Sequence, residues 1–162
     1  MVFFPSYAYL SRVDALLAAE GVPGAAILRE ARGLTEEEKN ALLGAFDKRD
    51  GRTVLLAVLG GAFAEGVDLA GERLQNVIVV STGLPQMDAR VRAMRRYHDE
   101  NGADGAFLCM TLPGMVRVIQ SAGRLIRTQS DHGALLLIDS RYQRGAERAL
   151  LSGTLIGDAL SG

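Results

Sequence analysis

Two arginines and a glutamine form the group of side chains best suited to chemistry in this sequence of 162 residues. Gln120, Arg124 and Arg127 follow i, i+4 and i+7 spacing, so on a helix all three would point to one side. Guanidinium forks match phosphate oxygens with paired hydrogen bonds. A glycine inside a helix costs about 1 kcal/mol relative to alanine, so Gly123 indicates a close approach. These residues predict a phosphate-binding stripe, with a solvated or salt-bridged face as the alternative.

A second candidate site is the glycine-rich segment at residues 60–71, which follows an expected strand. Three glycines in its first seven positions allow the backbone to approach a ligand closely. Glu65 and Asp68, on either side of Gly66, supply acceptors for hydroxyl or ammonium groups. The segment lacks the lysine and the Ser or Thr of a P-loop, so it cannot be the main triphosphate cradle. A glycine-rich turn with a helix cap explains the same residues about as well.

The third candidate is a short strand that breaks at Pro5 and turns directly into a helix at Ser6 and Tyr7. Free backbone N–H groups at a helix start, together with the Ser6 hydroxyl, can hold a phosphate, because the helix dipole and the unpaired donors both favour an anion. From this segment alone, the favoured interpretation is that Ser6 is only a helix N-cap.

Short apolar runs alternate with longer segments of helical period, which predicts an α/β fold with a mostly parallel sheet covered by helices on both faces. Such a sheet usually places its site at the carboxyl ends of the strands. The last three runs are apolar almost throughout, as in strands buried on both faces. Thr35 followed by Glu38 predicts a capping box. We expect strands at residues 2–4, 25–28, 53–58, 76–81 and 134–139, and helices at 7–20, 36–46, 88–101, 113–127 and from about 146.

Composition limits the class of protein. Hydrophobic residues make up 48% and charged residues 23%, which are ordinary proportions for one globular domain. No apolar run is long enough to cross a bilayer and no secretory signal occurs, so we expect an intracellular protein. Cys109 is the only cysteine, which rules out an internal disulfide or a cysteine-ligated metal cluster within this chain and favours a buried role.

The net charge of −1 hides an uneven distribution of charge. Residues 86–148 carry ten arginines against seven acidic residues, so an anion-binding face should draw on this half. Four of these arginines are best interpreted as a solvated helix face, with a DNA- or partner-facing patch as the alternative: Arg90, Arg92, Arg95 and Arg96.

Taken in order, the three candidate segments resemble motifs IV, V and VI of superfamily 2 helicases of the XPD/DinG group. The fourth motif of that group is similar to residues 3–10, and the fifth to Glu65-Gly66-Val67-Asp68. The sixth, Gln-x-x-Gly-Arg-x-x-Arg, is matched without departure at residues 120–127. The similarity continues through residues 83–85 and 128–141. It implies that residues 1–162 form a single RecA-like domain, a three-layer sandwich, and the C-terminal motor domain of such a helicase.

The resemblance implies roles for the sixth-motif residues in ATP hydrolysis. Arg124 and Arg127 would be arginine fingers that reach the γ-phosphate of ATP bound on another motor domain and stabilise charge in the transition state. Gln120 would orient the γ-phosphate or the attacking water, and Gly123 would lie close to the nucleotide.

The other two motifs would serve the cleft between domains and the nucleic acid. By resemblance, Glu65, Gly66 and Asp68 would contact the nucleotide or couple it to DNA. Ser6 and Tyr7 would meet the backbone of single-stranded DNA, where phosphate contacts position the strand without reading its sequence.

No P-loop and no Asp-Glu-x-His box occurs, and no metal site is expected in this chain. By resemblance, ATP and Mg²⁺ are held mainly by the first RecA-like domain of the same protein, which commonly carries an iron–sulfur cluster. The resemblance implies that the chain is a fragment of a longer DNA helicase that runs 5′ to 3′ and that the fragment is inactive alone. The expected location is the cytoplasm, nucleoid or nucleus, and the sequence leaves open whether the task is DNA repair, replication restart or defence against foreign DNA. A non-catalytic RecA-like module that binds DNA or protein is the alternative.

Overall fold

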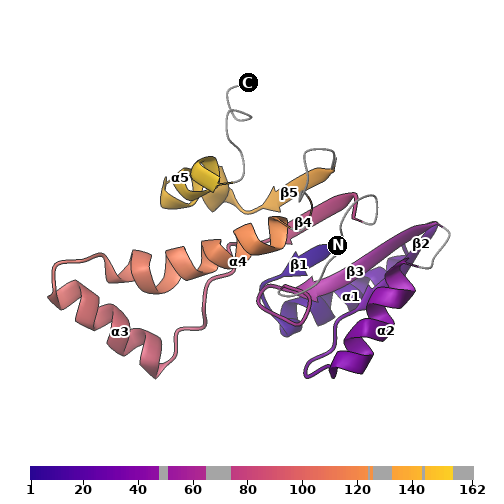
Figure 1. The fold of residues 1–162 in the computed structure, drawn as a ribbon, viewed down its shortest axis with the longest axis horizontal. Coiled ribbons are helices and arrows are strands. Elements are labelled where there is room, and N and C mark those ends of the chain that lie inside the picture. The colour runs from indigo at the N-terminus through magenta and orange to yellow at the C-terminus, as the bar shows by residue number, and fades with distance from the viewer. Residues whose placement is uncertain (48–50, 65–73, 124, 126–132, 144, 155–162) are drawn as a thin grey trace.

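The computed structural model describes residues 1–47, 51–64, 74–123, 125, 133–143 and 145–154. Within these ranges the strands form one parallel sheet in the order β2-β3-β1-β4-β5 (Figure 1). The predicted parallel sheet is confirmed, and each predicted strand end lies within one residue of the observed end. The strands are β1 (Val2–Phe4), β2 (Ala25–Arg29), β3 (Arg52–Val58), β4 (Asn76–Val80) and β5 (Ala134–Ile138).

Side-chain caps fix where several helices begin. The Ser6 side chain accepts the Tyr9 N–H at 3.2 Å, so Ser6 is the N-cap of α1. Thr35 and Glu38 form the predicted capping box, with reciprocal bonds of 3.2 and 2.9 Å. Asp88 caps α3. The helices are α1 (Tyr7–Glu20), α2 (Glu36–Asp47), α3 (Ala89–Glu100), α4 (Leu112–Ala122) and α5 (Gly145–Thr154).

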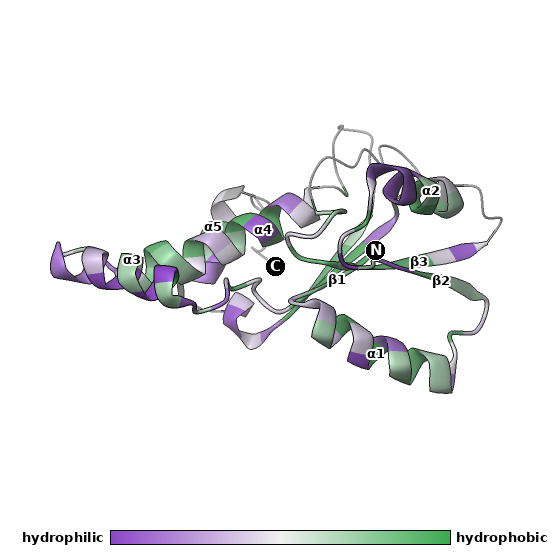
Figure 2. Cartoon of the chain, turned by 90° about the horizontal axis from the view of Figure 1, so that it is seen from below, coloured by the Kyte–Doolittle hydropathy of each residue, from purple (hydrophilic) through white to green (hydrophobic). Residues whose placement is uncertain are grey.

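The helices cover the sheet in three layers. α1 packs on one face, where Leu10 contacts a cluster that includes Phe4 and Leu56. α2, α4 and α5 supply side chains to the cluster on the other face, which surrounds Phe3 and Leu55. Figure 2 shows α1 and α2 on opposite sides of the sheet. The predicted covering of both faces is therefore confirmed. α3 extends away from the sheet, and none of its residues is buried (Figure 1). No helix in the described ranges is both long and apolar enough to span a membrane.

One prediction about burial is wrong. We expected β5 to be buried on both faces, but Leu136 and Ile138 are 53% and 49% exposed. β5 lies at the edge of the sheet, and α1 contacts β1 and β3 on that face rather than β5. An apolar run therefore indicated a strand of a parallel sheet without indicating how far the helices reach across it.

The predicted helix at residues 113–127 is also wrong at its C-terminal end. α4 ends at Ala122 with Gly123 as its C-cap, and the Leu125 N–H turns back to the Ala122 carbonyl at 3.0 Å. Leu125 is only 4% exposed, so the chain leaves the helix to bury this side chain in the core. Gln120 therefore lies within α4, and Gly123 lies at its C-cap rather than inside the helix.

A close contact between α4 and the loop after β4 positions this helix. Gly114 lies against the backbone of Thr82 and Gly83, where a Cβ atom would come within 2.6 Å of the Thr82 carbonyl oxygen. Gly44, inside α2, has nothing within 4 Å of the same position.

Gly114→Ala should therefore lower the free energy of unfolding by about 1–3 kcal/mol, because α4 must move off the loop. Gly44→Ala is the matched control and should raise it by up to about 1 kcal/mol, since only helix propensity changes. Urea unfolding of the 162-residue chain measures both. Equal effects of the two substitutions would contradict the close contact.

Candidate functional site

Three loops meet at the carboxyl edge of the sheet, where all strands of a parallel sheet end. β1 leads into Ser6, β2 into Glu30 and β3 into Gly60. The pairing of Phe4 with Val58, and the bond from the Leu59 N–H to the Phe4 carbonyl at 2.8 Å, hold the first and third loops side by side. The first predicted segment and the start of the second are thus brought together, as the parallel topology requires.

A buried carboxylate joins these three loops. Glu30 is 3% exposed, and its Oε1 accepts the Tyr7 hydroxyl at 2.8 Å and the Ala62 N–H at 2.7 Å. Its Oε2 accepts the Val58 N–H at 2.8 Å. Gly61 makes room for it, since a Cβ there would lie 2.2 Å from Oε1. Sequence reasoning missed Glu30; its only signal was an acidic residue directly after an apolar strand.

The polar side chains at the start of α1 are differently engaged. Burial and the hydrogen bond to Glu30 raise the pKa of Tyr7 to about 12, so its hydroxyl remains a donor. The Arg32 guanidinium lies 5.1 Å from the centre of the Tyr7 ring and is exposed. Ser6 Oγ accepts the Tyr9 N–H, which leaves its own proton free to donate to a ligand. This group presents one cation and one hydroxyl at the edge.

The ends of β4 and β5 carry a second polar cluster. Ser81 is the non-glycine residue with positive φ, 69°, among those described, and the buried Tyr142 hydroxyl donates to its carbonyl at 2.5 Å. The Arg141 guanidinium donates to Ser81 Oγ at 3.3 Å and to both oxygens of Asp139 at 2.8 and 2.7 Å. The Arg141 hydrogen bonds hold the pKa of Asp139 below its usual value. A strained turn is therefore fixed by an ion pair.

α4 lies between the carboxyl edge of the sheet, where the strands end, and the amino edge, where the strands begin. In the middle of α4, the half-buried Arg117 donates to the Gly83 carbonyl at 3.3 Å and lies over Gly60. Beyond its end, Leu125 packs against Gly133, and both lie close to the Gln75 carbonyl, just before β4 and β5 begin. The eleven residues of α4 span about 16 Å at 1.5 Å each. Of the third predicted segment, residues 120–123 therefore lie at the end of α4, and Leu125 lies at the amino edge, where the strands begin, opposite the first segment.

The structure places only some of the predicted site residues. Gln120 is exposed, next to the fully buried Ser121, and Gly123 is exposed at the C-cap. Ala64 and Leu74, each 2% exposed, anchor the two ends of the stretch that contains the predicted acidic residues. The remaining predicted residues lie outside the described part of the chain: Glu65, Gly66, Asp68, Arg124 and Arg127.

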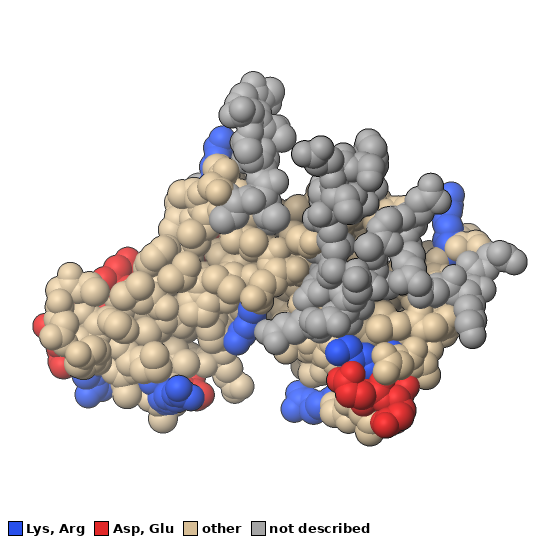
Figure 3. All heavy atoms as spheres, viewed as in Figure 1, with Lys and Arg blue, Asp and Glu red and all other residues tan. Residues whose placement is uncertain are grey.

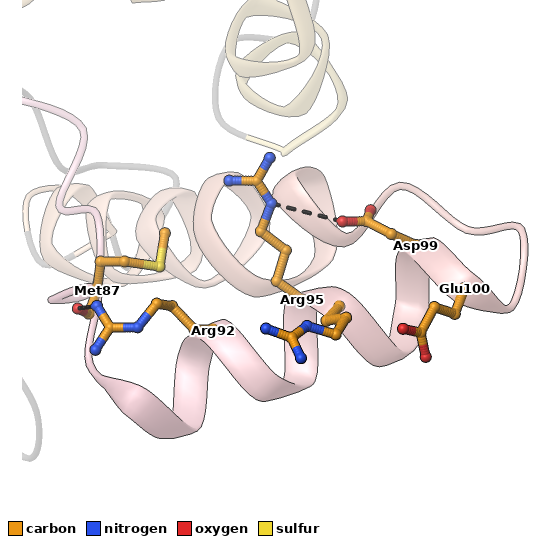
Figure 4. Close-up of a pocket in the computed structure, with 6 residues that line it drawn as sticks. Met87, Arg92, Arg95, Asp99 and Glu100 are labelled. Carbon is orange, nitrogen blue, oxygen red and sulfur yellow. Dashed lines mark hydrogen bonds and ion pairs between the residues drawn. The ribbon is translucent and has the colours of Figure 1, made fainter.

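Three arginines of α3 line an open hollow of about 630 Å³ together with Met87, Asp99 and Glu100: Arg92, Arg95 and Arg96 (Figure 4). Arg92 donates to the Met87 carbonyl at 3.0 Å, and Arg95 pairs with Asp99 at 3.7 Å. Figure 3 shows basic and acidic side chains mixed at this end of the molecule. These contacts favour the solvated, salt-bridged helix face over a phosphate-binding patch. No group of His, Cys, Asp and Glu able to hold a metal ion occurs in the described ranges.

The family model described as "Helicase C-terminal domain" matches residues 1–155. The chain belongs to the helicase C-terminal domain family. This helicase C-terminal domain is 33% identical over 168 residues to the "Regulator of telomere elongation helicase 1 homolog" of Anopheles gambiae, covering 94% of the chain and 17% of that protein. It is 29% identical over 164 residues to "ATP-dependent DNA helicase chl-1" of Caenorhabditis elegans, covering 98% of the chain and 20% of that protein. The domain thus spans about a fifth of these relatives.

Solved structures agree on the fold. A structure named XPD_APO superposes with a TM-score of 0.73 at 22% sequence identity, covering 93% of this helicase C-terminal domain and 30% of that chain. A second, named XPD_Helicase, gives 0.70 at 21% identity, covering 94% and 26%. The fold is RecA-like, as the resemblance implied, and the domain is similar to XPD helicases in architecture.

The ion pair at the end of β5 predicts a stability that depends on pH. The pKa of Asp139 is lowered in the folded state, so its contribution is present above the ordinary Asp value of about 3.9 and is lost as the pH falls through the lowered value. Asp139→Asn should therefore cost about 1 kcal/mol at neutral pH, a modest value because Arg141 is partly exposed.

Denaturant unfolding of the 162-residue chain at a series of pH values measures this difference. The deficit of the variant should shrink as the pH is lowered below about 3.9, because the wild type then loses the same interaction. A deficit that stays constant down to the acid limit would contradict the role of the ion pair.

Proposed function

We propose that this domain is the second motor domain of an ATP-dependent DNA helicase, in which it completes an ATPase site on the first RecA-like domain of the same protein. One contact carries the proposal. Gln75 follows the stretch with the acidic fifth-motif residues, Leu125 lies within the sixth motif, and the two meet around Gly133 at the amino edge. This contact between residues far apart in sequence supports the proposal that the fifth and sixth motifs face a single nucleotide.

The chemistry proposed at this edge is charge stabilisation. Arg124 and Arg127 are proposed to donate to the γ-phosphate oxygens as negative charge spreads over them in the transition state. Gln120, exposed on α4, is proposed to orient the attacking water or the γ-phosphate, with Gly123 close by. ATP and Mg²⁺ would be held mainly by the first domain, because the P-loop is missing from this sequence.

The stretch between the two edges is proposed to sense the nucleotide. Glu65, Gly66 and Asp68 fall between Ala64, buried near the carboxyl edge, and Leu74, buried just before β4. Their acceptor oxygens are proposed to contact the nucleotide or to couple it to the DNA.

The carboxyl edge is proposed to hold single-stranded DNA. Ser6 can donate its hydroxyl to a phosphate at the N-terminus of α1, where the helix dipole favours an anion. The Tyr7 hydroxyl already donates its hydrogen bond to Glu30. Tyr7 would therefore contact the DNA through its ring and would not donate a hydrogen bond to a phosphate. Exposed Arg32 beside that ring adds the positive charge that a phosphate backbone requires.

The remaining features of the whole protein are proposed from the resemblance. Residues 1–162 would be one domain of a longer helicase that moves 5′ to 3′ along DNA, with a possible iron–sulfur cluster in its first domain. The names of the relatives, "Regulator of telomere elongation helicase 1 homolog" and "ATP-dependent DNA helicase chl-1", fit a task in DNA maintenance or repair.

The arginine fingers are tested in the full-length protein with Arg124→Ala and Arg127→Ala. Each should lower the kcat of DNA-stimulated ATP hydrolysis by about 10³-fold or more, since arginine fingers contribute at least that factor. Arg12→Ala, an exposed arginine of α1 on the opposite face of the sheet from α4, is the matched control and should keep wild-type turnover. Near-normal turnover of both finger variants would refute their assignment.

The DNA edge is tested with Arg32→Gln in the full-length protein. The slope of log affinity for single-stranded DNA against log salt should fall by about 0.7, the value for one lost phosphate contact. Arg52→Gln, an exposed arginine at the start of β3 and therefore at the amino edge, should leave the slope unchanged. An unchanged slope in Arg32→Gln would exclude this cation from the DNA contact.

A further inference from the structure

We propose that Glu30 is a positioning residue. It couples the carboxyl edge, where single-stranded DNA is proposed to bind, to residues 65–68, which are proposed to contact the nucleotide. The inference rests on the proposed function and adds a residue and a route to it. Tyr7 lies in the segment proposed to meet DNA, and Ala62 lies three residues before the first acidic residue of the fifth motif. Glu30 hydrogen-bonds to both.

A single oxygen atom makes the connection. Glu30 Oε1 accepts the Tyr7 hydroxyl and the Ala62 N–H, at 2.8 and 2.7 Å, while Oε2 is held by the Val58 N–H. Because Val58 belongs to β3, an interior strand that pairs with β1 and β2, the carboxylate is anchored on the sheet. A displacement of Tyr7 therefore acts on the hydrogen bond to Ala62 through the atom that they share.

The turn that Glu30 grips is a hydrogen-bonded unit. The Gly61 N–H donates to the Val58 carbonyl at 2.9 Å, and the Ala64 N–H donates to the Gly61 carbonyl at 3.1 Å. Gly60 has a φ of 76°, a conformation that other residues rarely adopt. Gly61 packs so closely on the carboxylate that no side chain fits between them. A shift at Ala62 thus acts on the turn that ends at Ala64, the residue before the fifth motif in the sequence.

The burial of the Glu30 carboxylate supports a role in coupling rather than in stability alone. Glu30 is 3% exposed and its hydrogen-bond donors are a phenol and two amides, all neutral. Burying a charge without a charged partner is costly, and an apolar side chain would fill the same space at less cost. Tyr7 and Arg32 lie on the exposed side, at the proposed contact with single-stranded DNA. The hydrogen bond from Tyr7 to Glu30 therefore joins a residue that contacts the DNA directly to the buried carboxylate.

The test compares Tyr7→Phe and Glu30→Gln in the full-length protein. Tyr7→Phe removes only the hydroxyl that reaches Glu30. Glu30→Gln replaces one acceptor oxygen with an NH₂ group, which must face an N–H or O–H donor in either orientation. The readout is the ratio of ATP turnover at saturating single-stranded DNA to turnover without DNA. A loss of folded protein lowers both rates in proportion and leaves this ratio unchanged.

Both variants should lower the stimulation ratio at least about fivefold, the lower end of the usual coupling between sites. Tyr9→Phe is the matched control, because Tyr9 is 44% exposed and its ring stacks on Phe4, and it should keep the wild-type ratio. Wild-type ratios in Tyr7→Phe and in Glu30→Gln would overturn the coupling alone, and Tyr7→Phe decides if Glu30→Gln does not fold. A wild-type protein without DNA stimulation would instead overturn the proposed function.

Discussion

A parallel sheet obliges every connection to carry the chain from the carboxyl edge back to the amino edge, and the rest of this domain depends on that constraint. Ser6, Glu30 and Gly60 all follow strands, so they meet at the carboxyl edge. Leu125 and Gln75 precede strands, so they meet at the other edge. A domain built in this way has two separate groups of loops, one at each end of the strands, and the connections that cross the sheet join them.

Two polar groups, one buried and one partly exposed, fix the ends of these connections. Glu30 fastens the loop after β3 to the start of α1, and the pair of Asp139 and Arg141 fastens the strained turn at Ser81. Each group is satisfied by several hydrogen bonds, which a buried charge needs if it is not to destabilise the fold. Because each of these groups hydrogen-bonds to more than one segment of the chain, it is a suitable place for coupling between sites.

Much of the fold could be predicted from the sequence because local signals agreed with one another. Apolar runs gave the strands, and caps at Thr35 and Glu38 gave a helix start to the residue. The extent of α4 could not be predicted, because Leu125 continues the helical period while its burial in the core ends the helix. The role of Glu30 depends on three donors that lie close only after folding, so no local pattern could reveal it.

We propose a domain that supplies arginines to a nucleotide held elsewhere, and ATP turnover by the isolated 162-residue chain tests this most directly. The rate of ATP hydrolysis with the chain alone should equal the rate in buffer without protein at every ATP concentration, with or without single-stranded DNA. The full-length protein, assayed in parallel, should show saturable turnover stimulated by DNA. Saturable ATP hydrolysis by the isolated chain would contradict the account, because it would require a phosphate cradle within these residues.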